Sequence, residues 1–587
     1  MPTLFRQSLV LGALCALFLT SCGGTDSGAG TAPKDCNYAS TYDAIQATVF
    51  EAKGCTASAC HGDAVIGGLD LRADASFDAL VRTASTIDPS IERVFPGDQD
   101  RSLLYHKLAA ATEGTDLGSL GQPMPVDGEP LSEDQLEAMR LWLRAGAPSD
   151  SIVGGTLELL GCEGTFDAEP NKINPLPPPA SDEGVQFYAG GWDLGAEAED
   201  EVCFASYYDF TDDQVPREFQ VDCPQFGEGR RCFAFRRNEL AQDGQSHHSI
   251  IRVYTPESDP NGSAWGPWAC LGGEKAGQSC EPGTTDGCGP RSQCTTPAIT
   301  RVGCVFYPHA PPDFGLGGGA GGPTETQEPL SGAQESTAID LPPEGVYSVL
   351  PLRGFISWNS HGFNLTKKDT SIEQWVNLTF ASESERVWPR RQIFEADNIF
   401  AMSSVAPFAK REVCTTWTLP QHSQLLSLSS HMHRRGELFR IWLPPNDACA
   451  GTSNCLPPES EADYVSRLYD EPLYTYYDPP NDYSSAASED RTFKACAVYD
   501  NGADNPLEVK RESTKPNTPA CSFPLAACGC VPAERACFGG DNEGEPCNGD
   551  DSVCTGGGVC DACPLLGGVT TDDEMFIPLG SYYVDDL

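Results

Sequence analysis

Cysteine constrains the fold of this chain more than any other residue type. Twenty-six cysteines occur among 587 residues, and Cys15 lies in an apolar N-terminal run that we expect to be removed. Three further cysteines, Cys22, Cys55 and Cys60, have other predicted roles, and the remaining 22 are an even number that fits a set of disulfides. Disulfides persist in oxidising compartments, so the sequence predicts a protein of the periplasm or the cell surface.

Two cysteine clusters repeat nearly the same spacing. The clusters are Cys270, Cys280, Cys288 and Cys294, with intervals of ten, eight and six, and Cys537, Cys547, Cys554 and Cys560, with intervals of ten, seven and six. Each begins with a Cys-x-Gly-Gly sequence. We interpret both as disulfide-stapled loops. Calcium binding by their acidic residues is the alternative, although these residues follow no regular ligand order.

The balance of charge excludes one class of partner. The chain carries 38 Lys and Arg against 84 Asp and Glu, a formal charge of −46. Nucleic-acid binding depends on cationic side chains that displace counterions from phosphates, so DNA and RNA are poor candidates. With 40% hydrophobic residues the chain can bury sizeable cores, and its length predicts about four domains. We therefore expect a multidomain globular protein with an acidic surface.

The N-terminus has the features of an export signal followed by a lipid anchor. Arg6 precedes the apolar run 9–19, which is too short to span a bilayer. The run ends in Leu-Thr-Ser-Cys22, which resembles the bacterial lipobox. That resemblance implies a signal peptide over 1–21, a lipidated Cys22 and a flexible tether over 22–35, in the bacterial cell envelope and at its outer membrane. Ordinary secretion with a nearby cleavage site is the alternative.

In the first globular segment, two thiols are followed directly by an imidazole, in the sequence Cys55-Thr-Ala-Ser-Ala-Cys60-His61. Two cysteines can form thioethers to haem while the adjacent histidine ligates the iron, so this order is typical of haem c attachment. The spacing departs from the usual C-x-x-C-H. Downstream, Gln-Pro-Met124-Pro resembles the loop that carries the distal methionine of small cytochromes c. We predict an all-α cytochrome c-like domain over 36–150, with Met124 as the sixth ligand, and a linker over 151–165.

Other readings of this segment remain open. His106 is a rival distal ligand, and the distal position can also be open. A disulfide between Cys55 and Cys60 would remove the haem site altogether. The helix that follows begins with the capping box Ser-Glu-Asp-Gln at 132–135 and stops at Gly146. Met139 lies on its apolar face, where we expect it to pack in the core.

The long remainder of the chain predicts β-structure. Short segments rich in β-branched, aromatic or aliphatic residues, each bounded by turn formers, occur at 249–254, 423–429, 438–443 and 576–584. This pattern is typical of β-sandwiches.

Histidine is scarce, and most of it is clustered. Of nine histidines, five fall into three groups beside strand-like segments: the pair His247 and His248, then His361, then His431 and His433. Residues two apart on a strand share a face, so His431 and His433 can bind a single metal while Met432 points away. Adjacent histidines alternate faces, so the first pair can bind one metal only where the strand twists or bulges.

With these motifs in view, residues 240–587 resemble the copper type II, ascorbate-dependent monooxygenases, the family of peptidylglycine α-hydroxylating and dopamine β-monooxygenases. Four segments occur in the family's order: Gln-Ser-His247-His248, Trp-Asn-Ser-His361, His431-Met-His433, and Gly567-Gly followed by Asp-Asp-Glu-Met575. The resemblance implies one copper at His247, His248 and His361 and a second at His431, His433 and Met575. A thioether favours Cu(I), which agrees with that ligand set.

The resemblance further implies two jelly-roll-like β-sandwich domains over 166–383 and 384–587, with a cysteine-rich insertion at about 505–563. It implies an enzyme that hydroxylates a C–H bond of a small organic substrate with O2 and two electrons from an external donor. Ser429 stands where the peptidylglycine enzyme has a carboxylate-binding arginine, so glycine-extended peptides are poor candidates as substrates and the substrate is open. We also hypothesise that the haem relays electrons to the two coppers.

Three alternatives follow from the residues themselves. The group of His247, His248 and His361 alone suits zinc as well as copper. A haem and copper protein without a substrate pocket would be an electron carrier or a copper-handling lipoprotein. An adhesin-like surface protein stabilised by metal and disulfides is the third class. His309 and His422 have no motif around them, and we expect both to be surface or hydrogen-bonded residues.

Overall fold

The computed structural model describes residues 36–585 apart from 90, 100, 115–116, 118–119, 127, 164–165, 167, 212–213, 284–286, 301–303, 305–306, 312–313, 315–325, 334–335, 396–403, 445–461, 468, 470–471, 486, 512–529 and 568–572. The chain forms two compact units. We call the first, which ends at Thr165, the helical unit, and the second, which contains Phe166–Leu587, the β unit. Short stretches of 143–155 alternate between the two units. Residues 1–35, with the predicted signal peptide, tether and Cys22, lie outside the described residues.

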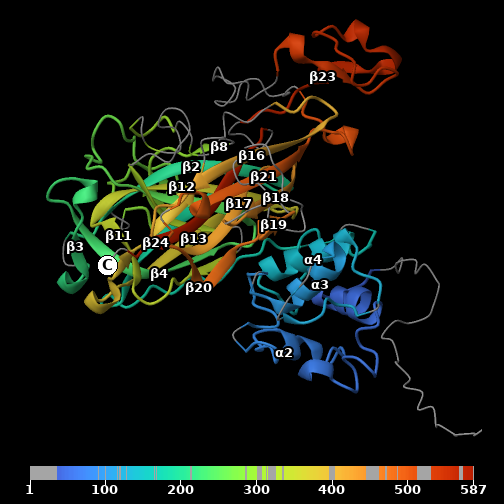
Figure 1. Cartoon of the computed structure of the whole chain (residues 1–587), viewed down its shortest axis with the longest axis horizontal. Helices are drawn as coiled ribbons and strands as arrows, with labels where there is room; N and C mark the ends of the chain where they lie inside the picture. Colours follow the sequence, from blue (N-terminus) through green and yellow to red (C-terminus); the bar gives the residue numbers. More distant parts are fainter. Residues whose placement is uncertain are drawn as a thin grey trace, which may run out of the picture. The chain divides into compact units, whose positions relative to one another are not determined.

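The helical unit consists of short helices joined by irregular segments (Figure 1). Its helices are α1 (Thr41–Ile45), which continues into a π-helical turn at Gln46–Glu51, α2 (Ser76–Leu80), α3 (Leu103–Glu113), α4 (Glu133–Arg144) and α5 (Thr156–Leu159). Aromatic packing of Tyr42 against Phe50, Phe77 and Trp142 forms its centre. A disulfide between Cys36 and Cys162 joins the two ends of the unit.

Helix α4 agrees with its sequence signals. The Ser132 hydroxyl accepts from the backbone N–H of Gln135 at 3.1 Å, and the Gln135 side chain accepts from the backbone N–H of Ser132 at 3.1 Å. This pair is the predicted capping box. Met139 is fully buried, which confirms its packing role, and Gly146 follows the helix with a positive φ of 87°.

The first half of the β unit is a sandwich of two sheets that are each seven-stranded. One has the order β1 (Gly184–Leu194), β13 (Thr370–Phe380), β4 (Arg231–Gln242), β11 (Val346–Pro351) and β14 (Trp388–Pro389), with β3 (Gln220–Asp222) and β10 (Thr337–Asp340) also paired to β4. The other has the order β6 (Ala269–Leu271), β7 (Gln293–Thr295), β2 (Ala198–Asp209), β12 (Arg353–Asn364), β5 (Ser246–Tyr254) and β9 (Gln327–Ala333), with β8 (Ile299–Thr300) paired to β2.

Alternating side chains explain why these two sheets stack. Fully buried residues of one sheet, such as Phe233 and Val376, join those of the other, such as Ile251 and Trp358, in one hydrophobic core. On β5 and β12 the residues between these core positions therefore point to the opposite face of their sheet. That outward face carries the first candidate metal group.

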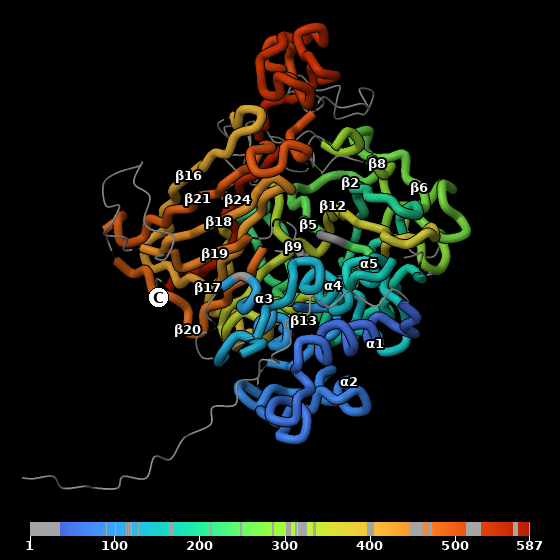
Figure 2. Tube along the Cα trace, turned by 90° about the vertical axis from the view of Figure 1, so that its right-hand side faces the viewer, coloured from blue at the N-terminus to red at the C-terminus, as the bar shows by residue number. Residues whose placement is uncertain are grey.

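The second half of the β unit is a smaller sandwich of two four-stranded sheets (Figure 2). Their orders are β15 (Arg391–Phe394), β24 (Ile577–Val584), β17 (Ser423–His431) and β20 (Thr475–Tyr483), and β16 (Lys410–Thr418), β21 (Thr492–Asp500), β18 (Gly436–Trp442) and β19 (Tyr464–Ser466). Leu425 and Leu428 of the first sheet pack against Phe439 and Phe493 of the second.

The repeated cysteine clusters form two modules with identical connectivity. In each module the first cysteine bonds the third and the second bonds the fourth: Cys270 with Cys288, Cys280 with Cys294, Cys537 with Cys554, and Cys547 with Cys560. The later module contains the hairpin β22 (Ala536–Phe538) and β23 (Val559–Ala562), which projects beyond the sheets in Figure 1. The prediction of disulfide-stapled loops is confirmed.

The predicted β-rich fold is also confirmed, because the β unit is built on five sheets and the helices are few and short within the described residues. β14 still pairs with β11, so the first sandwich extends a little past the predicted boundary at 383. The cytochrome c-like fold of the helical unit stays a prediction. Within the described residues, no helix is both long and apolar enough to cross a bilayer.

Candidate metal centres

The first candidate group forms where β5 and β12 lie side by side in an antiparallel pair. In their register His361 lies opposite His248, but the next residue, Gly362, lies opposite Ser246. His247 is therefore the extra residue of a β-bulge. A bulge is the local feature that the adjacent histidine pair needs in order to ligate one metal, and the backbone supplies it.

Gly362 shows why the bulge can form there. A Cβ at this position would collide with the Ile372 side chain and would lie 2.9 Å from the carbonyl oxygen of Gln245. The backbone N–H of Phe363 donates to that same carbonyl at 2.8 Å. Glycine thus lets β12 approach the bulged strand closely.

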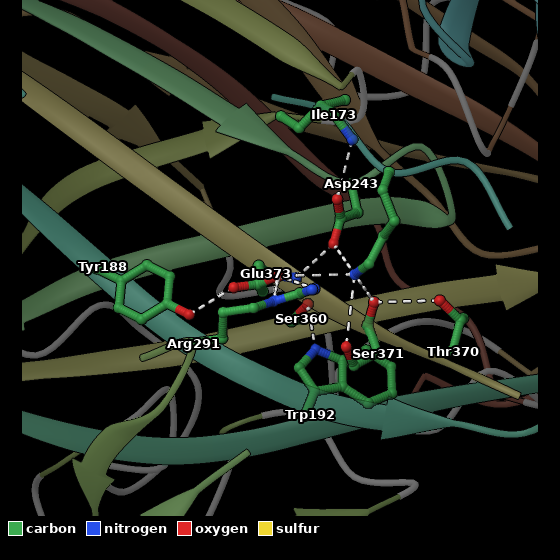
Figure 3. A network of polar contacts seen from close by, with 10 residues as sticks. Ile173, Tyr188, Trp192, Asp243, Arg291, Ser360, Thr370, Ser371 and Glu373 are labelled. Carbon is green, nitrogen blue, oxygen red and sulfur yellow. Dashed lines mark hydrogen bonds and ion pairs between the residues drawn. The ribbon is translucent and has the colours of Figure 1, made fainter. Parts of the chain in front are cut away.

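A buried polar network supports this pair of strands from the core side. Ser249 and Ser360 face each other in the register, and both hydroxyls accept from the side-chain amide of Gln374 on β13. The indole N–H of Trp192 also donates to Ser360, at 3.0 Å (Figure 3). Because satisfied buried networks rigidify their surroundings, the neighbours of His248 and His361 are held in place.

The network continues at the entrance to β5 (Figure 3). The buried carboxylate of Asp243 accepts from the backbone N–H groups of Ile173 at 3.2 Å and Glu373 at 2.9 Å, and it is paired with Lys172. The Glu373 carboxylate accepts from the Tyr188 hydroxyl at 2.6 Å and is paired with Arg291. These contacts anchor the segment that leads into the histidine pair.

Carboxylates surround His361 on the outward face of the sheet. Its Nε2 lies 2.8 Å from Glu199 Oε1, and in the register His361 lies opposite Glu201. Burial raises the pKa of Glu201, while His361 and the amide of Asn359 oppose that shift. A hydrogen-bonded carboxylate orients an imidazole and increases its basicity, which suits a metal ligand.

The second candidate group is at the end of β17. Met432 is buried in the core of the second sandwich, as predicted from strand alternation, so His431 and His433 lie on the outward face. Their ring centroids are 5.2 Å apart. Burial, aided by His433 and His361, lowers the pKa of His431 to about 3. His431 is therefore neutral at physiological pH, the state in which imidazole binds metal.

The methionine segment is joined to this group by sheet register and by hydrogen bonds. His431 lies opposite Ile577 at the end of the antiparallel pair of β17 and β24, and His433 and Met575 each lie two residues beyond that pair. The Nδ1 atom of His433 lies 3.1 Å from the carbonyl oxygen of Asp573. Met575 is 7% exposed, and its carbonyl accepts from the Tyr499 hydroxyl at 2.8 Å.

Glu574 is the centre of this arrangement. Its carboxylate accepts from the backbone N–H groups of His433 at 2.9 Å and Arg435 at 2.7 Å. The side chain is fully buried, and desolvation raises its pKa to about 8 although the backbone donors oppose the shift. Beside it, the buried ammonium of Lys510 donates to Asp573 at 2.5 Å. Sequence analysis missed these positioning residues, and an acidic pair directly before Met575 was their only local signal.

Two observations relate the faces that carry the two groups. The charge of His361 contributes to the lowered pKa of His431, although the two residues belong to different sandwiches. On the same outward faces, the Arg252 guanidinium of β5 lies 5.2 Å from the ring centroid of Phe394 on β15. Phe394 packs against Met575 and Ile577. Of the six predicted copper ligands, His361 lies on the first sandwich and His431, His433 and Met575 lie on the second, while the side chains of His247 and His248 lie outside the described ones.

The predicted haem residues fit their role only in part. His61 Nδ1 lies 3.0 Å from the carbonyl oxygen of Ile66. In metal-binding histidines the ring nitrogen that does not bind the metal typically makes such a contact. Burial lowers the pKa of His61, and the charges of Arg93 and Lys107 act in the same direction. The carbonyl of Lys107 accepts from the backbone N–H of Met124 at 2.9 Å.

The sulfur atoms of Cys55 and Cys60 do not both fit the predicted attachment of haem. Cys55 is a thiol, but Cys60 is disulfide-bonded. The alternative disulfide between Cys55 and Cys60 is also not formed. A sulfur in a disulfide cannot form a thioether to haem, so the structure lacks one of the two predicted attachment points.

Other potential ligand clusters within the described residues have partners already. The two cysteine triads, Cys270, Cys280 and Cys288 and Cys537, Cys547 and Cys554, are consumed by disulfides. The acidic triad of Glu437, Asp500 and Asp504 surrounds the Lys410 ammonium, at 2.7 Å from Glu437 and 3.3 Å from Asp500. His309 packs against Tyr307 and His422 is exposed, so neither joins a metal group.

No family model and no curated protein match the chain. Among solved structures, the major capsid protein P2 from bacteriophage PM2 is 7% identical, with 54% of this chain and 97% of that chain covered and a TM-score of 0.16. The STIV MCP is 8% identical, with 54% and 96% covered and a TM-score of 0.16. At such scores neither likeness bears on fold or function.

Proposed function

We propose that this protein is a copper-dependent monooxygenase that hydroxylates a C–H bond of a small organic substrate with O2. The observation that carries the proposal is the joining of the ends of β17 and β24, where His431 lies opposite Ile577 and the backbone N–H of His433 donates to Glu574, the neighbour of Met575 in sequence. Two imidazoles and a thioether form a donor set that suits copper in both oxidation states. His361, opposite His248, contributes to a second group that suits electron storage.

The residues around His431, His433 and Met575 orient these ligands and exclude water from them. Glu574 binds the backbone of His433 and Arg435, which fixes the strand end that carries both imidazoles. The contact between His433 Nδ1 and the Asp573 carbonyl favours the tautomer that presents Nε2 to a metal. Burial of His431 and Met575 excludes water from the place where substrate would react.

Copper bound at these residues would supply the activation of O2 and the transfer of one oxygen atom to substrate. The proposed reaction takes its two electrons from an external reductant. The proposal includes no electron route through haem, because haem attachment would first require the Cys60 disulfide to open. Lipid anchoring through Cys22 in the bacterial cell envelope belongs to the same proposal.

The test is oxygen consumption by the purified full-length chain, loaded with copper and supplied with ascorbate and candidate substrates. Consumption that requires both copper and reductant, and that yields a hydroxylated product, would support the proposal. Redox cycling of the copper without oxygen insertion would instead identify an electron carrier or a copper-handling protein. Zinc retained at both groups in purified protein would also contradict it.

A further inference from the structure

The outward face of the first sandwich carries a buried cation that the proposed copper chemistry does not use. Ile251 and Val253 of β5 are in the hydrophobic core, so Arg252 between them points to the opposite face. In the register Arg252 lies opposite Ser357, and His248 lies opposite His361. Arg252 therefore shares the face of the first metal group, about 13 Å along the strands from it.

This cation is covered by the second sandwich. Its guanidinium carbon lies 5.2 Å from the ring centroid of Phe394, which packs against the cluster of Met575 and Ile577. Arg252 is only 6% exposed. It thus lies next to Phe394, on the apolar cluster that contains Met575.

Among the described residues, Arg252 also has no counter-charge at contact distance. Its Nε is buried and has no hydrogen-bond partner within the described residues, where no carboxylate lies within 4.0 Å of the guanidinium. Glu328 acts on it only through longer-range attraction, and burial outweighs that attraction and lowers the pKa of Arg252 to about 10. A buried guanidinium with an unused donor is costly unless a partner completes it.

A second buried arginine shows what a completed site looks like. Arg440 on β18 is 8% exposed, and it lies 5.1 Å from the ring centroid of Trp442 with its Nε likewise unpaired. However, its guanidinium is ion-paired with Glu412 of the same sheet. Arg252 has the aromatic neighbour and the burial of Arg440 but not the carboxylate.

We propose that Arg252 binds the carboxylate of the substrate, so that the oxygenase acts on an organic monocarboxylate with an apolar carbon skeleton. A guanidinium pairs with a carboxylate through two parallel N–H bonds, which also fixes the orientation of the bound molecule. Phe394, Met575 and Ile577 provide the apolar surface for the carbon skeleton. Glu328 nearby opposes a dianion, which favours a carboxylate over a phosphate.

Calling the bound carboxylate a substrate rests on the proposed oxygenase function, so the test measures binding without turnover. The copper-loaded full-length protein is titrated with 4-phenylbutyrate, with its neutral amide and with inorganic phosphate, by calorimetry. We expect the carboxylate to bind about tenfold or more tightly than the amide, and more tightly than phosphate. Equal binding of acid and amide, or tighter binding of phosphate, would overturn the inference.

Variants assign the effect to one side chain. Arg252→Gln should remove the preference for acid over amide, Arg252→Lys should keep part of it, and Arg440→Gln should leave it unchanged. A preference that survives Arg252→Gln would exclude this residue. Near-UV circular dichroism checks that each variant is folded. If Arg252→Gln unfolds, the ratio of acid to amide affinity in the wild-type protein and in Arg252→Lys still tests the proposal. Carboxylate binding without oxygen consumption would contradict only the proposed oxygenase function. Oxygen consumption without a preference for the carboxylate would contradict only the proposed role of Arg252.

Discussion

The helical unit and the β unit bring their candidate ligands together in opposite ways. Cys55, Cys60 and His61 are neighbours in sequence, yet one sulfur is a thiol and the other is in a disulfide. His433 and Met575 are far apart in sequence, yet strand register and the Glu574 carboxylate join their segments. Proximity along the chain is therefore a weaker guide to a site than the hydrogen bonds that hold its parts.

The largest expected effect is on oxygen consumption, which should depend on the β unit and not on the helical unit. We expect His431→Ala to abolish copper-dependent oxygen consumption, because it removes an imidazole from the methionine group and with it about half of the bound copper. We expect His61→Ala to leave oxygen consumption with ascorbate unchanged. Oxygen electrode traces and copper analysis of both variants are the measurements. Loss of activity in His61→Ala would show that the helical unit takes part in electron supply.

The next effect concerns the hydrogen bonds that hold the β-unit site. Glu574→Ala leaves the buried N–H groups of His433 and Arg435 without an acceptor. Each such group costs roughly 1–3 kcal/mol, so we expect the free energy of unfolding to fall by about 3 kcal/mol. Urea denaturation followed by tryptophan fluorescence measures it.

Glu543→Ala is the matched control for this variant. The Glu543 carboxylate accepts from one backbone N–H, that of Gly539 at 3.0 Å, on an exposed turn. We expect a change within about 0.5 kcal/mol, because water replaces the lost acceptor. Equal changes in the free energy of unfolding of the two variants would contradict the role of Glu574 in holding the backbone of His433 and Arg435.

A smaller effect is expected at the first histidine group. Glu199→Gln removes the carboxylate that lies 2.8 Å from His361, and we expect copper affinity at this group to fall about tenfold. Because this carboxylate is 48% exposed, protein stability should hardly change. Competitive titration with a copper chelator measures the affinity. Glu197→Gln, at an exposed position on the approach to the same strand, is the control, and an equal loss there would point to general electrostatics.

Several local features could be predicted from the sequence because their causes are local. The capping box of α4 depends on Ser132 and Gln135 alone, and the burial of Met139 follows from helical spacing. The two cysteine modules share one connectivity because they share one spacing. Strand alternation likewise predicted that Met432 would point away from His431 and His433.

The remaining features depend on packing between distant segments. The bulge at His247 requires Gly362 of another strand to lie against Gln245. The role of Glu574 depends on backbone donors at His433 and Arg435, and no pattern around residue 574 indicates their presence.

Arg252 is a similar case. In the sequence it is an ordinary charged residue of an alternating strand, and only the cover provided by Phe394 makes it a buried cation. Periodicity predicts which face a residue takes, but not which segment covers that face.

The smallest effect tests the helical side of the comparison, through the chemistry of Cys55. Burial raises the pKa of this thiol to about 11, and since the thiolate is the reactive form, alkylation by iodoacetamide at pH 8 should be about tenfold or more slower than for an exposed thiol. The charged form is disfavoured only in the folded state, so stability should fall as pH rises from about 9 towards 11. Unfolding in urea should restore ordinary reactivity, which mass spectrometry of the labelled peptide measures. Fast labelling of the folded protein would contradict the burial of this sulfur. A haem-bearing peptide that resists labelling even in urea would instead mean that Cys55 is a thioether and that the Cys60 disulfide opens during maturation.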